Sequence, residues 1–384
     1  MPSQAALSLF DAPIPEDELL AQLRLIRSRR VGATTYHRLM AEHGDAVTAL
    51  DALPDIARAA GVERYEICPD GVARAELARG RALGAVPLVH GGPGYPAALA
   101  DLPDAPAILW ALGRTDLLDR PMVALVGARN ASSLGTRMAR KLAEGLADAG
   151  HIVVSGLARG IDRAAHMAAL ETGTIAVLAG GVDVIYPTEN EALFHEIGDK
   201  GLRMSEHPAG LQPQARHFPQ RNRIISGLAR AVVVVEAAAR SGSLITAHTA
   251  LDQGREVLAV PGHPFDARAA GCNMLIRDGA TLVRGPEDVI EALDSAPIRI
   301  PAPKPKPRIT EVPATPAHAR RPAPADPAAL HAEILSRLGP SPLAEDQLIR
   351  DLALPPGRIA PELLTLELEG RIARAPGGLL SRLD

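Results

Sequence analysis

The chain has 384 residues, 47% of them apolar, and a formal net charge of −4 at neutral pH. This length allows two or three domains with their own cores. The slightly acidic balance excludes nucleic-acid binding over the whole surface, so any such site must be a local patch. Cys68 and Cys272 form neither a disulfide framework nor a zinc-ligand spacing. From this spacing we expect no metal site. Because no segment resembles a signal peptide or a membrane span, we also expect a cytoplasmic protein with no membrane contact.

Residues 1–85 are predicted to form a small helical domain. Apolar residues recur at helical spacing from Leu19 to Ile26, a turn follows at Gly32, and a second helix is expected over 34–43. A glycine hairpin between short helices is typical of SAM and helix-hairpin-helix domains. Gly32 could contact a DNA backbone or a partner, but a plain helical bundle explains the same spacing.

Residues 86–295 alternate between strand-like and helical patterns. Continuous apolar runs separated by helices predict an α/β core with a mostly parallel, doubly wound sheet that is covered on both faces. Ligands of such sheets bind beyond the carboxyl ends of the strands. The predicted strands are 122–126, 152–155, 174–179, 202–205, 231–236 and 256–260.

Two further segments follow the predicted core. Residues 296–325 are rich in proline and basic side chains, which is typical of an extended linker. Residues 326–384 have the outline of a winged helix, with three helices and a glycine-tipped hairpin. The expected third helix, around 361–368, contains glutamates and no arginine before Arg371. That charge argues against reading of the major groove and favours contact with a protein.

Glycine turns that could hold an anion follow the first two core strands. A glycine lets the backbone turn sharply, and a serine can cap the next helix, whose free amides attract anions. Arginines stand beside both turns. The first turn contains Gly127 and Arg129, with Ser132 or Ser133 as the helix cap, and the second runs from Ser155 and Gly156 to Arg159.

The densest functional pattern lies further along the chain. Phe218, Arg221 and Arg223 fall within six residues and suit base stacking and phosphate pairing, the two contacts that single strands offer without sequence preference. Ser241 and Ser243 place hydroxyls at another helix start. The chain contains neither G-x-G-x-x-G after the first strand nor G-x-x-x-x-G-K-[ST], so we expect no dinucleotide cofactor and no P-loop ATPase.

Asp162 and His166 share one helix face at i, i+4, where they could act as an acid and a base or bind a metal. No third ligand and no nucleophile accompany them. An aspartate that favours a helix start and a hydrogen-bonded helix histidine explain the pair better than catalysis does.

These motifs together resemble the DNA processing protein A family (DprA, also called Smf). Seven of them occur in order between about residues 95 and 280, and the flanking modules fit the longer members of the family, in which a SAM-like and a winged-helix-like domain flank a Rossmann-like core. The matching motifs are Val126-Gly127-x-Arg129, Ser155-Gly156-x-Ala158-x-Gly160-Ile161-Asp162, Tyr186-Pro187, Phe218-Pro219-x-Arg221-Asn222-Arg223-Ile224-Ile225-Ser226-Gly227, Ser241-Gly242-Ser243-Leu244-Ile245-Thr246-Ala247, Pro261-Gly262 and Gly271-Cys272-Asn273.

The resemblance implies a protein without catalytic activity that binds single-stranded DNA taken up during natural transformation, protects it and loads the RecA recombinase onto it. It also implies a homodimer formed through the cores. The chain departs from the usual family pattern at Ala128 and Leu134, where serine and tyrosine are common. Carried onto this sequence, the DNA-binding residues are Gly127, Arg129, Ser132, Ser155, Gly156, Arg159, Phe218, Arg221, Asn222, Arg223, Ser241 and Ser243.

Two other functions fit parts of the pattern. A nucleotide phosphoribohydrolase of the lysine-decarboxylase-like type shares the core fold, but it needs a P-G-G-x-G-T-x-x-E run, and the comparable segment 239–247 has no such acid. A regulator whose winged helix reads duplex DNA is the third reading, against which the acidic third helix argues.

Overall fold

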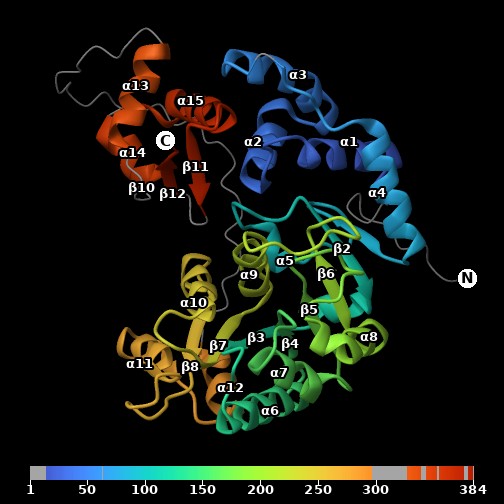
Figure 1. The fold of residues 1–384 in the computed structure, drawn as a ribbon, viewed down its shortest axis with the longest axis vertical. Coiled ribbons are helices and arrows are strands. Elements are labelled where there is room, and N and C mark those ends of the chain that lie inside the picture. The colour runs from blue at the N-terminus through green and yellow to red at the C-terminus, as the bar shows by residue number, and fades with distance from the viewer. Residues whose placement is uncertain are drawn as a thin grey trace, which may run out of the picture. The chain divides into compact units, whose positions relative to one another are not determined.

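The computed structural model describes residues 14–62, 64–295, 327–338, 343–352, 354–375 and 379–383 (Figure 1). The chain divides into two compact units. One comprises Met1–Asp55 and Arg64–Leu293, and the other Ile56–Glu63 and Asp294–Asp384. The predicted linker 296–325 lies outside the described residues. No helix in the described part of the chain is both long and apolar enough to cross a membrane.

The first unit begins with short helices, as the sequence predicts. The first of them has three acidic residues in its first turn and two arginines in its last, which suits the helix dipole. Leu23, Leu25 and Leu39 are fully buried between the helices. The four helices are α1 (Glu16–Arg27), α2 (Ala33–His43), α3 (Ala46–Ala59) and α4 (Asp70–Ala82), and the unit boundary after Asp55 falls within α3.

Helix α4 packs against the sheet through a glycine. A Cβ atom on Gly80 would lie 2.3 Å from the Trp110 ring, so only a glycine lets the helix approach this closely. The Trp110 indole donates a hydrogen bond of 2.9 Å to the carboxylate of Glu76, which also accepts two hydrogen bonds from Arg27 of α1. One buried carboxylate thereby joins two helices to a strand.

The core is a nine-stranded sheet in the order β1-β2-β6-β5-β4-β3-β7-β8-β9. The seven strands β6, β5, β4, β3, β7, β8 and β9 run parallel to their neighbours. At one edge of the sheet, β2 pairs antiparallel with both β6 and β1. Their bounds are β1 (Val86–Val89), β2 (Ile108–Gly113), β3 (Met122–Gly127), β4 (Ile152–Ser155), β5 (Thr174–Val177), β6 (Leu202–Ser205), β7 (Ala231–Glu236), β8 (Glu256–Ala259) and β9 (Thr281–Leu282).

Helices cover both faces of this sheet, which explains why its central strands are mainly apolar. Val123 and Leu125 of β3 pack under α6 and α7, whereas Ala124 and Val126 of the same strand face the opposite cluster with α9 and α10. Figure 1 shows α6 and α7 on one side of β3 and β4, and α9 on the other. The expected doubly wound, Rossmann-like core is confirmed. The remaining elements of the core are α5 (Ala97–Ala100), η1 (Thr115–Asp119), α6 (Ser133–Asp148), α7 (Ile161–Ala169), η2 (Thr188–Asn190), α8 (Glu191–Lys200), α9 (His217–Leu228), α10 (Gly242–Asp252), α11 (Ala270–Arg277) and α12 (Pro286–Ser295).

The second unit contains the predicted winged helix. Its third helix begins earlier than the sequence predicts, and its acidic side chains are used within the unit: Glu362 contacts His331, and Glu367 lies 3.6 Å from the buried Arg374. The expected glycine tip at 376–378 lies outside the described residues. The elements are α13 (Pro327–Arg337), β10 (Leu343–Ala344), α14 (Glu345–Leu352), α15 (Pro356–Leu368), β11 (Ile372–Ala375) and β12 (Leu379–Arg382), with the strands in the order β10-β12-β11.

The close packing of α4 gives a stability prediction. The Gly80→Ala variant should lower the free energy of unfolding by about 1–3 kcal/mol, because the added methyl group overlaps the Trp110 ring. Gly71→Ala in the same helix is the matched control, since nothing lies within 4 Å of its Cβ position, and it should leave stability unchanged or raise it by up to about 1 kcal/mol. Urea unfolding measures both. Equal effects would contradict the packing described.

Candidate nucleic-acid interface

Two cavities of about 260 and 580 Å³ open at the carboxyl edge of the sheet. Loops after β3, β4 and β7 meet the start of α9 there, around the point where the strand order reverses between β3 and β7. This is the place at which a doubly wound sheet binds its ligands. The cavities adjoin, because both are lined by Arg129, Ala158, Phe218 and Arg221.

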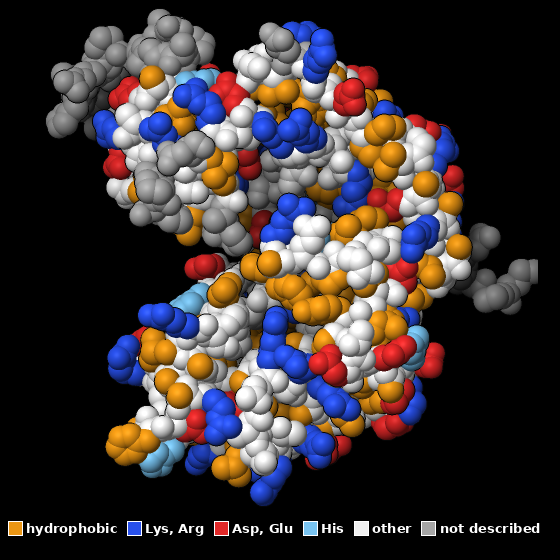
Figure 2. Space-filling model, in the orientation of Figure 1, with side chains coloured by type: hydrophobic (Ala, Val, Ile, Leu, Met, Phe, Trp, Pro, Cys, Tyr) orange, Lys and Arg blue, Asp and Glu red, His pale blue; other side chains and the backbone are white. Residues whose placement is uncertain are grey.

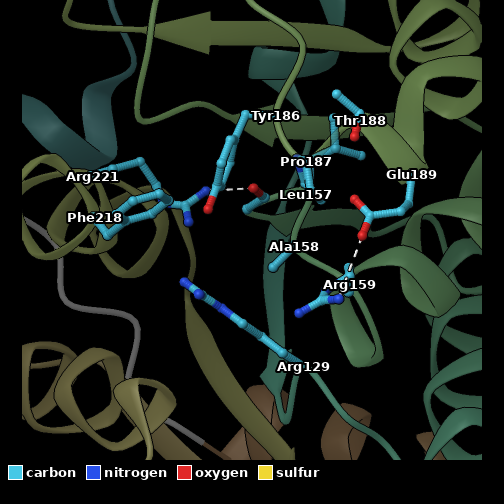
Figure 3. Close-up of a pocket in the computed structure, with 11 residues that line it drawn as sticks. Arg129, Leu157, Ala158, Arg159, Tyr186, Pro187, Thr188, Glu189, Phe218 and Arg221 are labelled. Carbon is cyan, nitrogen blue, oxygen red and sulfur yellow. Dashed lines mark hydrogen bonds and ion pairs between the residues drawn. The ribbon is translucent and has the colours of Figure 1, made fainter. Parts of the chain in front are cut away.

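The exposed Arg129 and Tyr186 lie at this edge together with the half-buried Phe218. The Arg129 guanidinium carbon lies 5.4 Å from the centroid of the Phe218 ring, and the Tyr186 ring lies 5.4 Å from Phe218. Figure 3 shows Arg129 extending across the pocket toward Phe218 and Arg221. Among the described residues no acidic side chain pairs with Arg129. Its positive charge therefore remains available to a ligand.

Arg221 has a different environment from the one that the sequence suggests. It is buried, and its Nη1 donates to the carbonyl oxygens of Gly156 at 2.6 Å and Val177 at 2.5 Å. A Cβ on Gly156 would lie 2.1 Å from that nitrogen, so the position requires glycine. Burial lowers the pKa of Arg221 to about 10, against the opposing charge of Asp162. Arg221 holds the ends of β4 and β5 together, and it borders both cavities.

The glycine turn after β4 holds an anion that belongs to the protein. The buried Asp162 carboxylate accepts hydrogen bonds from the amides of Gly156 at 3.2 Å and Ala158 at 3.3 Å. Burial raises the pKa of Asp162, and the charge of Arg221 counters that effect. The cradle that the sequence predicts is present, but a side chain of the same chain fills it.

A carboxylate of the protein also occupies the backbone amide at the start of α6. Ser132 caps the helix by accepting a hydrogen bond of 2.9 Å from the Gly135 amide, as predicted. The Ser132 amide itself donates at 2.8 Å to the carboxylate of Glu236, the last residue of β7. A Cβ on Gly135 would lie 2.6 Å from that carboxylate. Glu236 therefore takes the place where a phosphate would bind.

Arg223 is not brought into the pocket. It is buried, pairs with Glu206, donates to the Asp104 carbonyl oxygen, and lines neither cavity. The side-chain hydroxyl of Ser155 is also buried and donates 2.6 Å to the Leu125 carbonyl oxygen.

Of the predicted residues, Ser132, Ser155 and Arg223 border neither cavity, and the others border at least one of them. Arg159 borders the smaller one, where it forms an ion pair of 3.4 Å with Glu189 (Figure 3). Gly127, Asn222, Ser241 and Ser243 border the larger one, and the Ser241 side chain caps α10.

Several lining residues were not assigned a role from the sequence, among them Tyr186, Asn130 and Arg268. Tyr186 belongs to a motif of the resemblance, but its contact with Phe218 needs the fold. Asn130 and Arg268 border the larger cavity. Arg268 lies in the loop after β8, so the rule that ligands bind at strand ends was the available signal.

His166 is a buried structural residue of α7. Its Nδ1 lies 2.8 Å from Thr174 Oγ1, whose hydroxyl donates to the Val153 carbonyl oxygen, so Nδ1 carries the ring hydrogen. Nε2 has no partner among the described residues. Burial, with a smaller effect of Arg221, lowers the pKa of His166 to about 3.

The described residues contain no group of three or more metal-ligating side chains.

Figure 2 shows Lys and Arg side chains interspersed with Asp and Glu over the visible face, without one continuous basic surface. Any basic site is therefore local.

The fold and the groove formed by the two adjoining cavities define a class of protein. It has a Rossmann-like core with an arginine and aromatic rings at the carboxyl edge of its sheet, accompanied by a helical and a winged-helix domain. Family models match the chain in the same order, a DprA-like N-terminal HHH domain at residues 16–78, the DNA recombination-mediator protein A at 87–294 and a DprA winged helix domain at 318–378. The chain belongs to the DNA recombination-mediator protein A family, known as DprA or Smf.

Relatives support this assignment over most of the chain. The DNA processing protein DprA of Streptococcus pneumoniae is 49% identical over 51% of this chain and 70% of its own length. The Protein Smf of Synechocystis is 37% identical over 74% of this chain and 77% of its own length. The X-ray structure of the S. pneumoniae DprA aligns with a TM-score of 0.60 at 38% identity and covers 70% of this chain and 95% of that one. A structure of DNA processing protein A from Helicobacter pylori, titled for its single-stranded DNA binding mode, aligns with a TM-score of 0.51 at 31% identity over 54% of this chain and 95% of that one.

Substitution of Arg221 should destabilise the protein, whereas substitution of Arg129 should not. Arg221→Met leaves Asp162 and two carbonyl oxygens buried without their partner, and it should lower the free energy of unfolding by about 3–5 kcal/mol. Arg129→Gln removes an exposed charge without an acidic partner in the described chain and should change it by less than about 0.5 kcal/mol. Urea denaturation compares the two, and a large loss in the Arg129 variant would contradict this division.

His166 should make the protein less stable as the pH falls. Its folded-state pKa of about 3 lies below the unfolded value of 6.5, so the unfolded state binds more protons between these values. Stability should fall by roughly 1.4 kcal/mol per pH unit through this window because of His166 alone. His166→Asn keeps a donor near Thr174 and cannot titrate. Urea unfolding at several pH values should show a shallower pH dependence for the variant, and parallel curves would refute this explanation.

Proposed function

We propose that this protein binds single-stranded DNA in the groove formed by the two cavities, without sequence preference and without chemistry on the strand. The observation that carries the proposal is the exposed Arg129, which has no acidic partner among the described residues and lies over the Phe218 ring beside Tyr186. A guanidinium for phosphates and aromatic faces for bases are the groups that single-strand binders combine. The relative from H. pylori, whose title names single-stranded DNA, supports the same ligand.

The groove suits a strand better than a free nucleotide. Glu236 and Asp162 occupy the backbone amides that bind terminal phosphates in other nucleotide-binding sheets. The unpaired charge is instead Arg129, at the boundary that the two cavities share. A chain of phosphodiesters can pass such a point and place bases on both sides of it.

The structure also disfavours the phosphoribohydrolase alternative. Asp162 accepts two amide hydrogen bonds in a buried position, and His166 is buried with its Nδ1 donating to Thr174. Asp162 borders the larger cavity, but its carboxylate is held by the two amides, and His166 borders neither cavity. Release of free base from nucleoside monophosphates by the purified protein would favour the enzyme and contradict the proposed function.

The proposed function extends to recombination. We infer from the family membership that the bound strand is incoming DNA, that the protein protects it, and that it passes the strand to the RecA recombinase.

We also propose that two copies of the protein associate through their cores. The short edge strand β9 exposes Leu282 at 41%, and α11 exposes Met274 at 41%. An apolar side chain on an unpaired sheet edge is a typical place for association with a second copy.

The groove gives a direct binding test. Arg129→Gln should weaken binding to oligonucleotides of any sequence and flatten the slope of log affinity against log salt by about 0.7. Phe218→Leu should cost about 1–3 kcal/mol of binding through lost stacking while leaving the salt slope unchanged. Arg137→Gln is the matched control, because Arg137 is exposed on α6 and lines neither cavity. Fluorescence anisotropy over a salt series measures all three, and unchanged affinity in both groove variants would refute the site.

A further inference from the structure

The hairpin between α1 and α2, residues 28–32, is fixed and open to solvent. Ser28 ends α1, donates its hydroxyl to the Arg24 carbonyl oxygen at 2.7 Å and accepts from the Cys68 amide at 2.9 Å. Val31 is buried and anchors the turn, and Arg30 adopts a left-handed φ of 62°. Nothing lies within 4 Å of the Cβ position of Gly32, which begins α2. The backbone is therefore held in place while its outer side is accessible.

This hairpin presents positive charge. Arg29 and Arg30 are exposed, and no acidic partner is found for either in the described part of the chain. Both charges act on the nearby Tyr65, whose hydroxyl donates to the Arg29 carbonyl oxygen at 2.6 Å. The first turn of α2 contains no acidic residue, in contrast to the first turn of α1. A cationic hairpin without carboxylates is suited to a polyanion.

Partly buried contacts join the hairpin to the helix that carries Phe218. Arg27, directly before the hairpin, pairs with Glu76 and donates to the Glu206 carbonyl oxygen at 3.0 Å. The Glu206 carboxylate pairs with Arg223 of α9. On the α2 side, His37 Nε2 lies 2.8 Å from the Ala105 carbonyl oxygen, next to the residue whose carbonyl oxygen Arg223 contacts. The hairpin and α9 therefore have a fixed relation within the first unit.

The surface between them carries further positive charge. Burial, together with the nearby His217, Arg27, Arg223 and Arg216, lowers the pKa of His207 to about 4. His207 is consequently neutral at physiological pH. Arg27 and Arg223 are paired with Glu76 and Glu206. The exposed Arg216, two residues before Phe218, contacts only the His217 ring in the hydrogen bonds found among the described residues.

We propose that the hairpin 28–32 is a second contact for single-stranded DNA, and that a strand leaving the groove at Phe218 passes Arg216 and lays its phosphates on Arg29 and Arg30. This inference rests on the proposed function, because it concerns the path of the same ligand. The contact is electrostatic and independent of sequence. Only a strand long enough to extend beyond the groove can make it.

Oligonucleotide length tests the proposal. Binding of oligothymidylates of about 6 and about 20 nucleotides is measured by fluorescence anisotropy over a salt series. The double variant Arg29→Gln with Arg30→Gln should bind the long strand roughly three- to tenfold more weakly at low salt, with a salt slope reduced by up to about 1.4. Its affinity for the short strand should equal that of the unaltered protein.

The matched control is the double variant Arg74→Gln with Arg81→Gln. It removes the same charge from the same domain, but these arginines are paired with Asp70 and Glu16, and long-strand binding should be unchanged. The proposal is overturned if the hairpin variant binds the long strand normally, if it loses both lengths equally, or if the control loses as much. It is also overturned if the variant loses affinity for a duplex and not for the strand. Failure of the groove itself would appear separately, as normal short-strand binding by Arg129→Gln.

Discussion

The buried guanidinium of Arg221 is the constraint on which the binding edge depends. One Nη1 atom holds the carbonyl oxygens at the ends of the β4 and β5 regions, and Gly156 must be a glycine to admit it. The same charge offsets the burial of Asp162, which in turn organises the turn from Gly156 to Ala158. Removing a buried charge from such an arrangement is costly, because its partners cannot regain water. The floor of the groove is therefore rigid before any ligand arrives.

A second consequence concerns how this sheet uses its anion sites. A doubly wound fold offers amide groups to phosphates at its helix starts. In this chain the carboxylates of Glu236 and Asp162 accept those hydrogen bonds. The cavities still offer a ligand the side-chain charge of Arg129 and the faces of Phe218 and Tyr186. The site lies where doubly wound folds bind nucleotides, but its side chains suit a single strand of nucleic acid better than a free nucleotide.

Much of the architecture follows from local patterns. Every strand predicted within the parallel part of the core exists, because burial on both faces requires continuous apolar runs such as Val232–Val235. The strands β1, β2 and β9 were not predicted. β1 and β9 are short edge strands, and residue patterns do not reveal pairing with a distant partner such as β6. In the winged helix, α15 starts at Pro356 because proline is tolerated in the first turn.

The sequence by itself determined the family, the alternating α/β core with its helical flanks, and the turns at the carboxyl edge of the sheet, since strand ends and glycine turns are local features. Only the tertiary structure decided what each arginine does. Arg129, Arg221 and Arg223 look equivalent in the sequence, yet one is exposed without an acidic partner in the described chain, one is buried against carbonyl oxygens, and one is paired with Glu206. The physical reason is that burial and the position of a counter-charge depend on residues distant in sequence. An arginine's role is set by those neighbours.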